Sequence, residues 1–327
     1  MQQTRQTQPQ SGSRVYIASG IDRRSDFFKR LKRDLFINKS LYLLVLPVVI
    51  FYIIFHYKPM YGAIIAFKQY APAKGVLGSP WVGFDHFVRF FSSHSFWRIF
   101  RNTFLISFYS LLFGFPAPII LALLLNELKN EKFKRTVQTI SYLPHFISLV
   151  VVAGMIKDFT VTDGIINDFI ELFGGERVPI LQKAELFRPV YIISGIWQEI
   201  GWGSIIYLAA LSGISQELYE AAMIDGAGRF KQVIHVTIPG IAPTIIIMLI
   251  LRIGQLMNVG YEKIILLYNP STYETADVIS SYVYRVGLLE FSWSYSAAVG
   301  LFNSVVNFIL VIAANWVSRR VTETSLW

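Results

Sequence analysis

Long apolar runs, separated by polar and charged connections, form the main pattern along the chain. Four runs hold no Asp, Glu, Lys or Arg, and they cover residues 104–125, 136–156, 232–251 and 294–318. A run at 40–57 is shorter but resumes at 59–67, and a run at 189–211 holds one charge, Glu199. Because a helix needs about 20 apolar residues to cross a bilayer, the pattern predicts six transmembrane helices in an all-α membrane protein.

Composition supports a membrane protein. Of the 327 residues, 54% are hydrophobic and only 16% are charged, and the mean hydropathy is +0.47. A soluble domain carries about a quarter charged residues. A large soluble protein with an unusually apolar core could bury a single run of this kind, but six runs in one chain favour membrane spans. The first apolar run starts too far into the chain for a cleavable signal peptide, so none is expected.

The positive charges predict which connections face the cytoplasm. The net charge is +9, and Lys and Arg gather in the first 40 residues, the 126–136 connection, the stretch 219–240 and the C-terminal end. Loops rich in Lys and Arg stay cytoplasmic, so both termini and these two connections are expected inside. We therefore expect the excess Lys and Arg residues to determine the membrane topology and to contact anionic lipid, rather than to bind nucleic acid.

The chain divides into four predicted segments. Residues 1–24 are basic and rich in Gln, Thr, Ser and Gly, which predicts a disordered tail. Residues 25–39 place large apolar residues on one helical face and basic residues opposite, which predicts an interfacial amphipathic helix; a soluble lead-in is the alternative. Residues 40–318 form the predicted six-span domain, and residues 319–327 form a cytoplasmic tail.

A polar stretch, YEAAMIDGAGRFKQVIHVTIPG at 219–240, interrupts the apolar pattern between the runs 189–211 and 232–251. Ser215 is a candidate N-cap for a short helix, and Gly226 and Gly228 end it. Ala221 and Ala222 leave a face with almost no side chain, which another surface can approach closely. The pattern favours a docking helix at about 215–228 on the cytoplasmic side; an ordinary connecting loop is the alternative.

The same stretch resembles the EAA motif of ABC-importer permeases, EAA-x3-G-x9-I-x-L-P. The matching residues are Glu220, Ala221, Ala222, Gly226 and Pro239, with Val236 and Ile238 as conservative departures and Asp225-Gly226-Ala227 in the DGA form of sugar-uptake permeases. The segments YKPMYGAIIAFKQY (57–70), NTFLISFYSLLFGFPAPIILALLLNEL (102–128) and DGIIN (163–167) resemble the branch that imports oligosaccharides and larger glycans. The resemblance covers about residues 40–320.

The resemblance implies the six-helix type I ABC-importer permease arrangement, preceded by the cytoplasmic amphipathic helix that the pattern at residues 25–39 predicts. It also implies that the EAA helix is a cytoplasmic coupling helix, which seats on a separate ATPase subunit. The docking residues that it implies are Glu220, Ala221, Ala222, Asp225, Gly226 and Pro239.

The implied function is that of the permease subunit of an ATP-driven importer in the bacterial inner membrane. The implied partners are a second permease, two ATPase subunits that carry ATP and Mg²⁺, and an extracytoplasmic binding protein that delivers an oligosaccharide or larger glycan. The sequence leaves open whether the second permease is identical or merely homologous. It also leaves open whether the glycan contains uronic acids, as in alginate or pectin fragments, or is neutral.

No catalytic or metal site can be built from the sequence. Phosphate-binding, nucleophile-elbow and zinc-protease motifs are missing, the chain has no Cys, and its five His are scattered. We therefore expect no enzyme activity, metal or cofactor on this chain. An ion-coupled secondary transporter, the main alternative, should carry acidic residues within its spans, and only Glu199 fits. A membrane-embedded enzyme is less favoured still.

Polar residues inside the predicted spans are candidates for a substrate path. Arg252, Gln255 and Asn258 follow one another at three-residue spacing and so share a helix face. Asn303 and Asn307, four residues apart, share another. Unpaired polar groups are costly in lipid, so both sets either line a wet cavity or bond neighbouring helices.

Glu199 and Arg252 lie at similar predicted depths. Because charges inside a membrane normally face a partner or a cavity, we expect an ion pair or a shared water site between them in at least one transport state; Arg252 reaching outward alone is the alternative. Tyr109 and Trp197 are candidate aromatic surfaces for sugar rings.

Overall fold

The computed structural model describes residues 33–321, and these are almost entirely helical. The predicted tail 1–24, most of the predicted helix 25–39 and residues 322–327 lie outside the described residues. Within them, the β-structure consists of one isolated bridge, between Lys68 and Trp81. The all-α prediction is therefore confirmed for the described part of the chain. The chain forms two units, Met1–Gly62 and Ala63–Trp327.

One long helical segment dominates the first unit. Helix α2 (Lys39–Tyr52) continues through the π-helical turn η1 (Ile53–Tyr57) into α3 (Lys58–Met60) and the 3₁₀-helical η2 (Tyr61–Phe67). The segment Lys39–Phe67 has 29 residues and is apolar enough to cross a membrane. The helix therefore continues through Lys58, where the apolar run of the sequence is interrupted.

The π-helical turn explains how this segment passes Pro59. The Lys58 N–H bonds to the Ile53 carbonyl, five residues back, and Pro59 follows with no N–H to satisfy. In an α-helix a proline ring clashes with the carbonyl four residues earlier. A π-turn shifts the local hydrogen-bond pattern from four to five residues, and so lets the helix continue.

Three helical segments of the second unit are also long and apolar enough to cross a membrane. They are His94–Asn126, which joins α6 (His94–Gly114) to α7 (Pro116–Asn126); Arg229–Ile253, which joins α13 (Arg229–Gln232), the π-helical η6 (Val233–Thr237) and α14 (Ile238–Ile253); and Trp293–Arg320 within α18 (Trp293–Val321). They correspond to the predicted spans 104–125, 232–251 and 294–318.

The predicted single helix at 136–156 is wrong. The chain instead forms α8 (Glu131–Tyr142), a 3₁₀ turn η4 (Leu143–Phe146), α9 (Leu149–Thr160) and α10 (Ile165–Leu172). The direction changes by 100° between Phe146 and Leu149. Pro144 lies in the turn, and Ser148 caps the new helix by accepting a hydrogen bond from the Val151 N–H at 3.4 Å. Apolar composition alone does not show where a helix axis turns.

The predicted span 189–211 is the central helix of the second unit, α11 (Ala184–Ser212). It contacts α6, α7, α8, α14 and α16 (Tyr273–Ala276). With 29 residues it is long enough to cross a membrane, but it is less apolar than the four segments named above. The described residues thus contain four clear membrane-length helices, or five if the bent pair counts as one span, and the count of six stays a prediction.

Short elements complete the second unit. They are η3 (Pro72–Lys74), α4 (Gly75–Gly78), α5 (Asp85–Phe91), η5 (Ile180–Gln182), α12 (Gln216–Ile224), α15 (Tyr261–Leu267), η7 (Pro270–Thr272), α17 (Ile279–Tyr284) and the π-helical η8 (Arg285–Leu289). Buried side chains form three clusters. One of them, around Tyr207, Leu211 and Ile241, fixes α11 against α14 beside the short helix α12.

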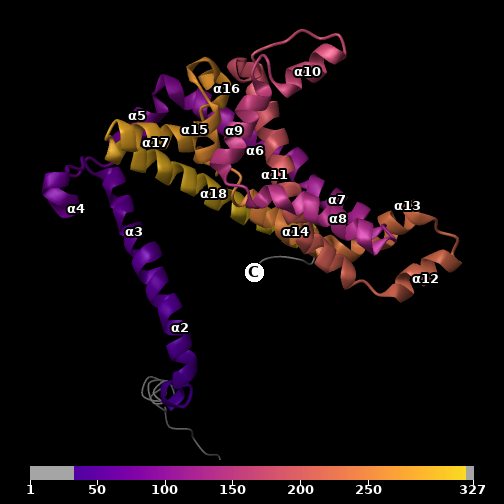
Figure 1. Cartoon of the computed structure of the whole chain (residues 1–327). Coiled ribbons are helices and arrows are strands. Elements are labelled where there is room, and N and C mark those ends of the chain that lie inside the picture. Colours follow the sequence, from indigo (N-terminus) through magenta and orange to yellow (C-terminus); the bar gives the residue numbers. More distant parts are fainter. Residues whose placement is uncertain (1–32, 322–327) are drawn as a thin grey trace, which may run out of the picture. The chain divides into compact units, whose positions relative to one another are not determined.

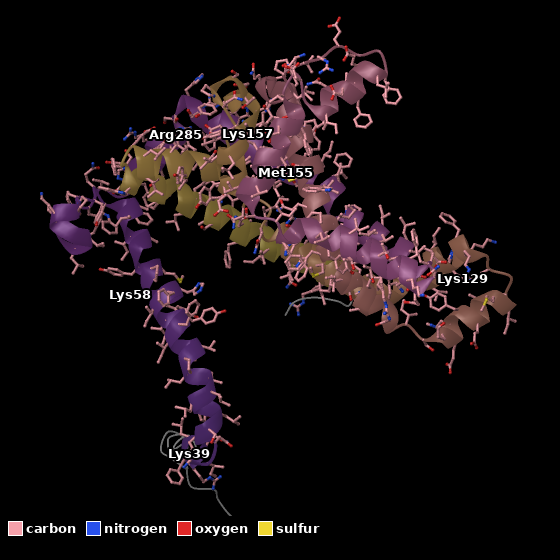
Figure 2. All side chains as sticks on the ribbon, in the orientation of Figure 1. Lys39, Lys58, Lys129, Met155, Lys157 and Arg285 are labelled. Atoms are coloured by element: carbon pink, nitrogen blue, oxygen red, sulfur yellow. The ribbon has the colours of Figure 1, made fainter. Side chains whose placement is uncertain are left out.

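The connections of the second unit lie at two ends. Figure 1 shows α12 and α13 at one end, and α10 and α16 at the opposite end. Lys129, in the connection between α7 and α8, lies at the α12 end, whereas Lys157 and Arg285 lie towards the other (Figure 2). An ion pair of 3.5 Å between Glu127 and Arg229 joins the two basic connections. They therefore share one side of the protein, as the charge pattern predicts.

Candidate functional site

The predicted docking helix is present as α12. Ser215 caps its start, since its hydroxyl accepts a hydrogen bond from the Glu217 N–H at 3.3 Å. At the other end the Ala227 N–H bonds to the Ala222 carbonyl at 2.9 Å, and Gly226 takes the left-handed conformation with φ +77°. Only glycine adopts this conformation without a steric cost. Both local predictions, the Ser215 cap and the stop at Gly226, are confirmed.

Large apolar side chains stand exposed around this helix. Ile224 is 88% exposed and Phe230 77%, and Leu218 and Met223 are more than half exposed. Exposed apolar groups clustered at a polar end of a molecule mark an interaction surface. Of the predicted docking residues, Glu220, Ala221, Asp225 and Gly226 are exposed there, and Ala222 is half-buried. Pro239 lies apart from them, inside the helical segment that follows.

Several contacts fasten α12 to the helix Arg229–Ile253. The Tyr219 hydroxyl lies 3.1 Å from the Thr237 hydroxyl, and the Gln232 amide donates to the Ala227 carbonyl at 2.8 Å. Gly240 lets Ile214 pack closely, since a Cβ on this glycine would lie 2.8 Å from the Ile214 side chain. These contacts hold α12 against the long helix behind it.

That long helix ends at a cavity of about 430 Å³ between α6, α7, α11, α14 and α15. Ser110, Gln198, Glu199, Arg252 and Lys263 contribute polar groups to its wall. The volume lies within the range of about 300–1,000 Å³ that is usual for small-molecule sites.

A second cavity adjoins the first, and a third adjoins the second. One of about 200 Å³ shares Ser110, Tyr191 and Arg252 with the first and is lined also by Gln255 and Asn258. Another, of about 500 Å³, shares Asn258 and is lined also by Asn303. Helix α14 ends at Ile253, so Arg252, Gln255 and Asn258 do not share one helical face as predicted. The turn after α14 nevertheless brings all three to cavity walls.

Glu199 bonds to His145 and not to Arg252. The His145 Nδ1 lies 3.0 Å from the Glu199 carboxylate, and the His145 ring stacks on Trp202 with ring centres 4.5 Å apart. His145 belongs to the turn where the α8–α9 pair bends, which brings it to α11. Glu199 and Arg252 still line the same cavity, but in this conformation they form no ion pair within the described residues.

The remaining candidates have different surroundings. Asn307 accepts a hydrogen bond from the Met257 N–H at 3.0 Å, and so holds the turn after α14 in place. Asn303 is buried, and its Oδ1 has no partner among the described residues. Trp197 lines a separate, apolar cavity between α9, α10 and α11. Tyr109 lies against the rings of Phe108 and Phe113.

Lys263, which lies in α15 between α14 and α18, was not among the predicted site residues. Its side chain is buried, and its Nζ donates to the Tyr191 carbonyl at 3.2 Å and lies 4.9 Å from the Tyr191 ring centre. Burial lowers the pKa of Lys263 to about 8, and the negative charge of Glu199 offsets part of this shift. The available signal was weak: Lys263 and Glu262 are the charged residues that precede the apolar run IILLY.

A second unpredicted group, centred on Asp277, lies at the end opposite α12. The Asp277 side chain is fully buried; its carboxylate accepts a hydrogen bond from Arg285 at 2.7 Å and pairs with Arg98 at 3.6 Å. Asn102 donates to the backbone carbonyls of Glu274 and Asp277. These bonds tie α6 to the segment between α16 and η8.

The described residues contain no group of three or more His, Asp or Glu suited to hold a metal ion. Membrane-length helices, neighbouring cavities with charged and amide side chains in their walls, and an exposed short helix at one end are the features of a membrane transport protein.

Comparison with known proteins identifies its family. Residues 114–323 match the sequence model of the inner membrane component of binding-protein-dependent transport systems. Protein LplB of Bacillus subtilis is 47% identical over 298 residues, which cover 91% of this chain and 92% of LplB. The polygalacturonan/rhamnogalacturonan transport system permease protein YteP of the same species is 45% identical over 300 residues, 91% of this chain and 94% of YteP.

Solved structures of similar proteins identify the same family of transport proteins. A chain of a bacterial ABC transporter involved in the import of the acidic polysaccharide alginate is 48% identical, with a TM-score of 0.83, and the match covers 90% of this chain and 99% of that one. A chain of a bacterial alginate ABC transporter in complex with alginate pentasaccharide-bound periplasmic protein is 47% identical, with a TM-score of 0.84 over 91% and 100%. The present chain belongs to this family of ABC-importer permeases, as the EAA resemblance predicts.

Proposed function

We propose that the chain is the permease subunit of an ATP-driven importer that takes up oligosaccharides or larger glycans delivered by an extracytoplasmic binding protein. One observation carries this proposal: the exposed helix α12 is bonded to a continuous helix that reaches a cavity lined by Arg252, Glu199 and Lys263. The substrate class is supported by the relatives, since YteP is a polygalacturonan/rhamnogalacturonan permease and the solved transporters import alginate.

ATP and Mg²⁺ bind to two separate ATPase subunits, and α12 docks on one of them. Its exposed apolar side chains become buried in that contact, together with Glu220, Ala221, Ala222, Asp225 and Gly226. Pro239 acts within the long helix rather than at the docking surface. When the ATPase subunits move, α12 moves with them, and the helix Arg229–Ile253 tilts at the cavity as a rigid element.

The α12 end faces the cytoplasm, because it carries the basic connections at 126–136 and 219–240. Both chain termini are cytoplasmic in the bacterial inner membrane, and residues 40–318 form the permease domain. The substrate path follows the joined cavities and is lined by Glu199, Arg252, Gln255, Asn258 and Asn303. A second permease, homologous to this one, completes the path, because six spans are too few to enclose a glycan alone.

Reconstitution with the partner subunits tests this proposal. In proteoliposomes, glycan-loaded binding protein should stimulate ATP hydrolysis and ATP-dependent uptake. Glu220→Lys reverses an exposed charge on α12 and should abolish stimulation or assembly. Glu176→Lys, an equally exposed reversal after α10, should leave both intact. Uptake that follows an ion gradient and ignores ATP would instead support a secondary transporter.

A further inference from the structure

We infer that Lys263 binds a carboxylate of the transported sugar, so that the first cavity selects acidic, uronate-containing oligosaccharides over neutral ones. This inference rests on the proposed function as a glycan importer and specifies its substrate class. The argument starts from the charge balance of the cavity wall.

Lys263 is a buried cation without a carboxylate partner. Its side chain is 8% exposed, and among the described residues its contacts are a backbone carbonyl and the face of the Tyr191 ring. Burying a charge without a counter-ion is costly, and ionisable residues inside membrane domains usually mark a substrate or ion pathway. A methionine or leucine would fill the same space at no electrostatic cost.

The cavity as a whole has an excess of positive charge. Arg252 and Lys263 contribute two cations to its wall, and Glu199 contributes one carboxylate. That carboxylate is already engaged by His145 at 3.0 Å, and no carboxylate lies within ion-pair distance of either cation in the described part of the chain. An anion that enters therefore meets a wall with two cations and one carboxylate, and so with a net positive charge.

The other polar groups of the wall suit a sugar. Ser110 and Gln198 present a hydroxyl and an amide, which exchange hydrogen bonds with sugar hydroxyls. Arg252 can bind a carboxylate through two parallel N–H groups, whereas a lysine acts as a point charge with freely oriented donors. Together these groups match a sugar unit that carries both hydroxyls and one carboxylate.

The test compares an acidic and a neutral substrate in the same reconstituted complex. A galacturonate oligosaccharide and its fully methyl-esterified form share the same backbone, but only the first carries carboxylates. Uptake of both is measured with wild type, Lys263→Met, Lys263→Gln, Lys263→Arg and the control Lys157→Met. Every variant uses the same binding protein, whose own preference cancels when the acidic-to-neutral uptake ratio of a variant is divided by that of wild type.

We expect Lys263→Met and Lys263→Gln to lower this ratio about tenfold or more, as for the loss of one charge-assisted hydrogen bond. Lys263→Arg keeps the charge and should retain most of the preference, and Lys157→Met, which alters an exposed lysine on α9, should retain all of it. The glutamine can still donate to the Tyr191 carbonyl, so it provides the test even if the methionine variant does not assemble.

Equal losses of both substrates in the glutamine variant would show a structural role for Lys263 and overturn the inference. An unchanged ratio would do the same. A wild-type complex that imports only the neutral substrate would overturn it while leaving the proposed function in place. A wild-type complex that imports neither substrate and shows no stimulated ATP hydrolysis would instead contradict the proposed function.

Discussion

A side chain on Gly201 would collide with the backbone carbonyl of Ser141, so α11 and α8 touch backbone to backbone. This contact lies beside the bend at η4, where His145 bonds to Glu199. Close approach at Gly201 therefore helps to set the position of the bent pair against the central helix.

Gly201→Ala should destabilise the protein by about 1–3 kcal/mol, the usual cost of overpacking a tight contact. Gly154→Ala in α9 is the matched control, because a Cβ there would meet nothing within 4 Å. Thermal unfolding of the detergent-solubilised complex measures both. Equal unfolding temperatures for the two variants would show that the contact can relax.

Gly226→Ala should weaken coupling between ATP hydrolysis and uptake. Gly226 has φ +77°, and an L-residue pays about 1–2 kcal/mol in the left-handed region, so the end of α12 should fray and its docking surface should change. Gly228→Ala provides the comparison, because its φ of −69° suits any residue. The measurement is ATP hydrolysis stimulated by the loaded binding protein, and full stimulation in Gly226→Ala would argue against a coupling role for this helix end.

Asp277→Asn should cost about 3–5 kcal/mol, because it leaves the partly buried Arg285 without its counter-ion. Asp168→Asn is a useful contrast. Asp168 pairs with Arg177 at 2.6 Å, closer than Asp277 approaches Arg285, but it is 55% exposed, and exposed pairs contribute little to stability. Unfolding midpoints compare the two, and a larger loss in Asp168→Asn would mean that burial does not decide the outcome.

Preference for acidic substrate should fall as the pH rises through about 8. Burial lowers the pKa of Lys263 to about 8, so the ammonium that binds a carboxylate is present below this pH and lost above it. Glu199 and Arg252 line the same cavity, and the Tyr191 ring lies against Lys263. The uptake ratio of acidic to neutral oligosaccharide between pH 6.5 and about 9.5 measures the effect. A ratio that falls equally in Lys263→Arg would assign it to another group.

Cysteine labelling should distinguish cavity residues from structural ones, since the chain has no cysteine of its own. Cysteines at Arg252, Gln255 and Asn258 should react with water-soluble thiol reagents, and loaded binding protein should change the rate. A cysteine at Asn307 should react slowly, because that side chain packs against the Met257 backbone. If all four stay unreactive in both resting and ATP-trapped complexes, the path runs elsewhere.

Local signals in the sequence sufficed for α12, because capping by Ser215 and the left-handed turn at Gly226 depend on a few neighbouring residues. The bend between Phe146 and Leu149 was missed, since an apolar count contains no information on the direction of a helix axis. Lys263 was missed for a different reason. Its burial depends on Tyr191, 72 residues away in sequence, and only long-range packing shows that α15 reaches the cavity. The same bend brings His145 to Glu199 in place of the expected Arg252.

The number of residues in the π-helical turn at Val233–Thr237 determines in which direction the side chains of the following helix point. As at Pro59, this turn directly precedes an X-Pro pair, and the Ile238 N–H bonds five residues back, to Val233. Each residue of an α-helix advances the side-chain direction by about 100°, and a π-turn holds one residue more than an α-turn. That additional residue therefore sets the rotation of Arg252 about the helix axis relative to α12. Deleting one residue here would turn Arg252 out of the cavity wall, although no side chain in either site had been touched.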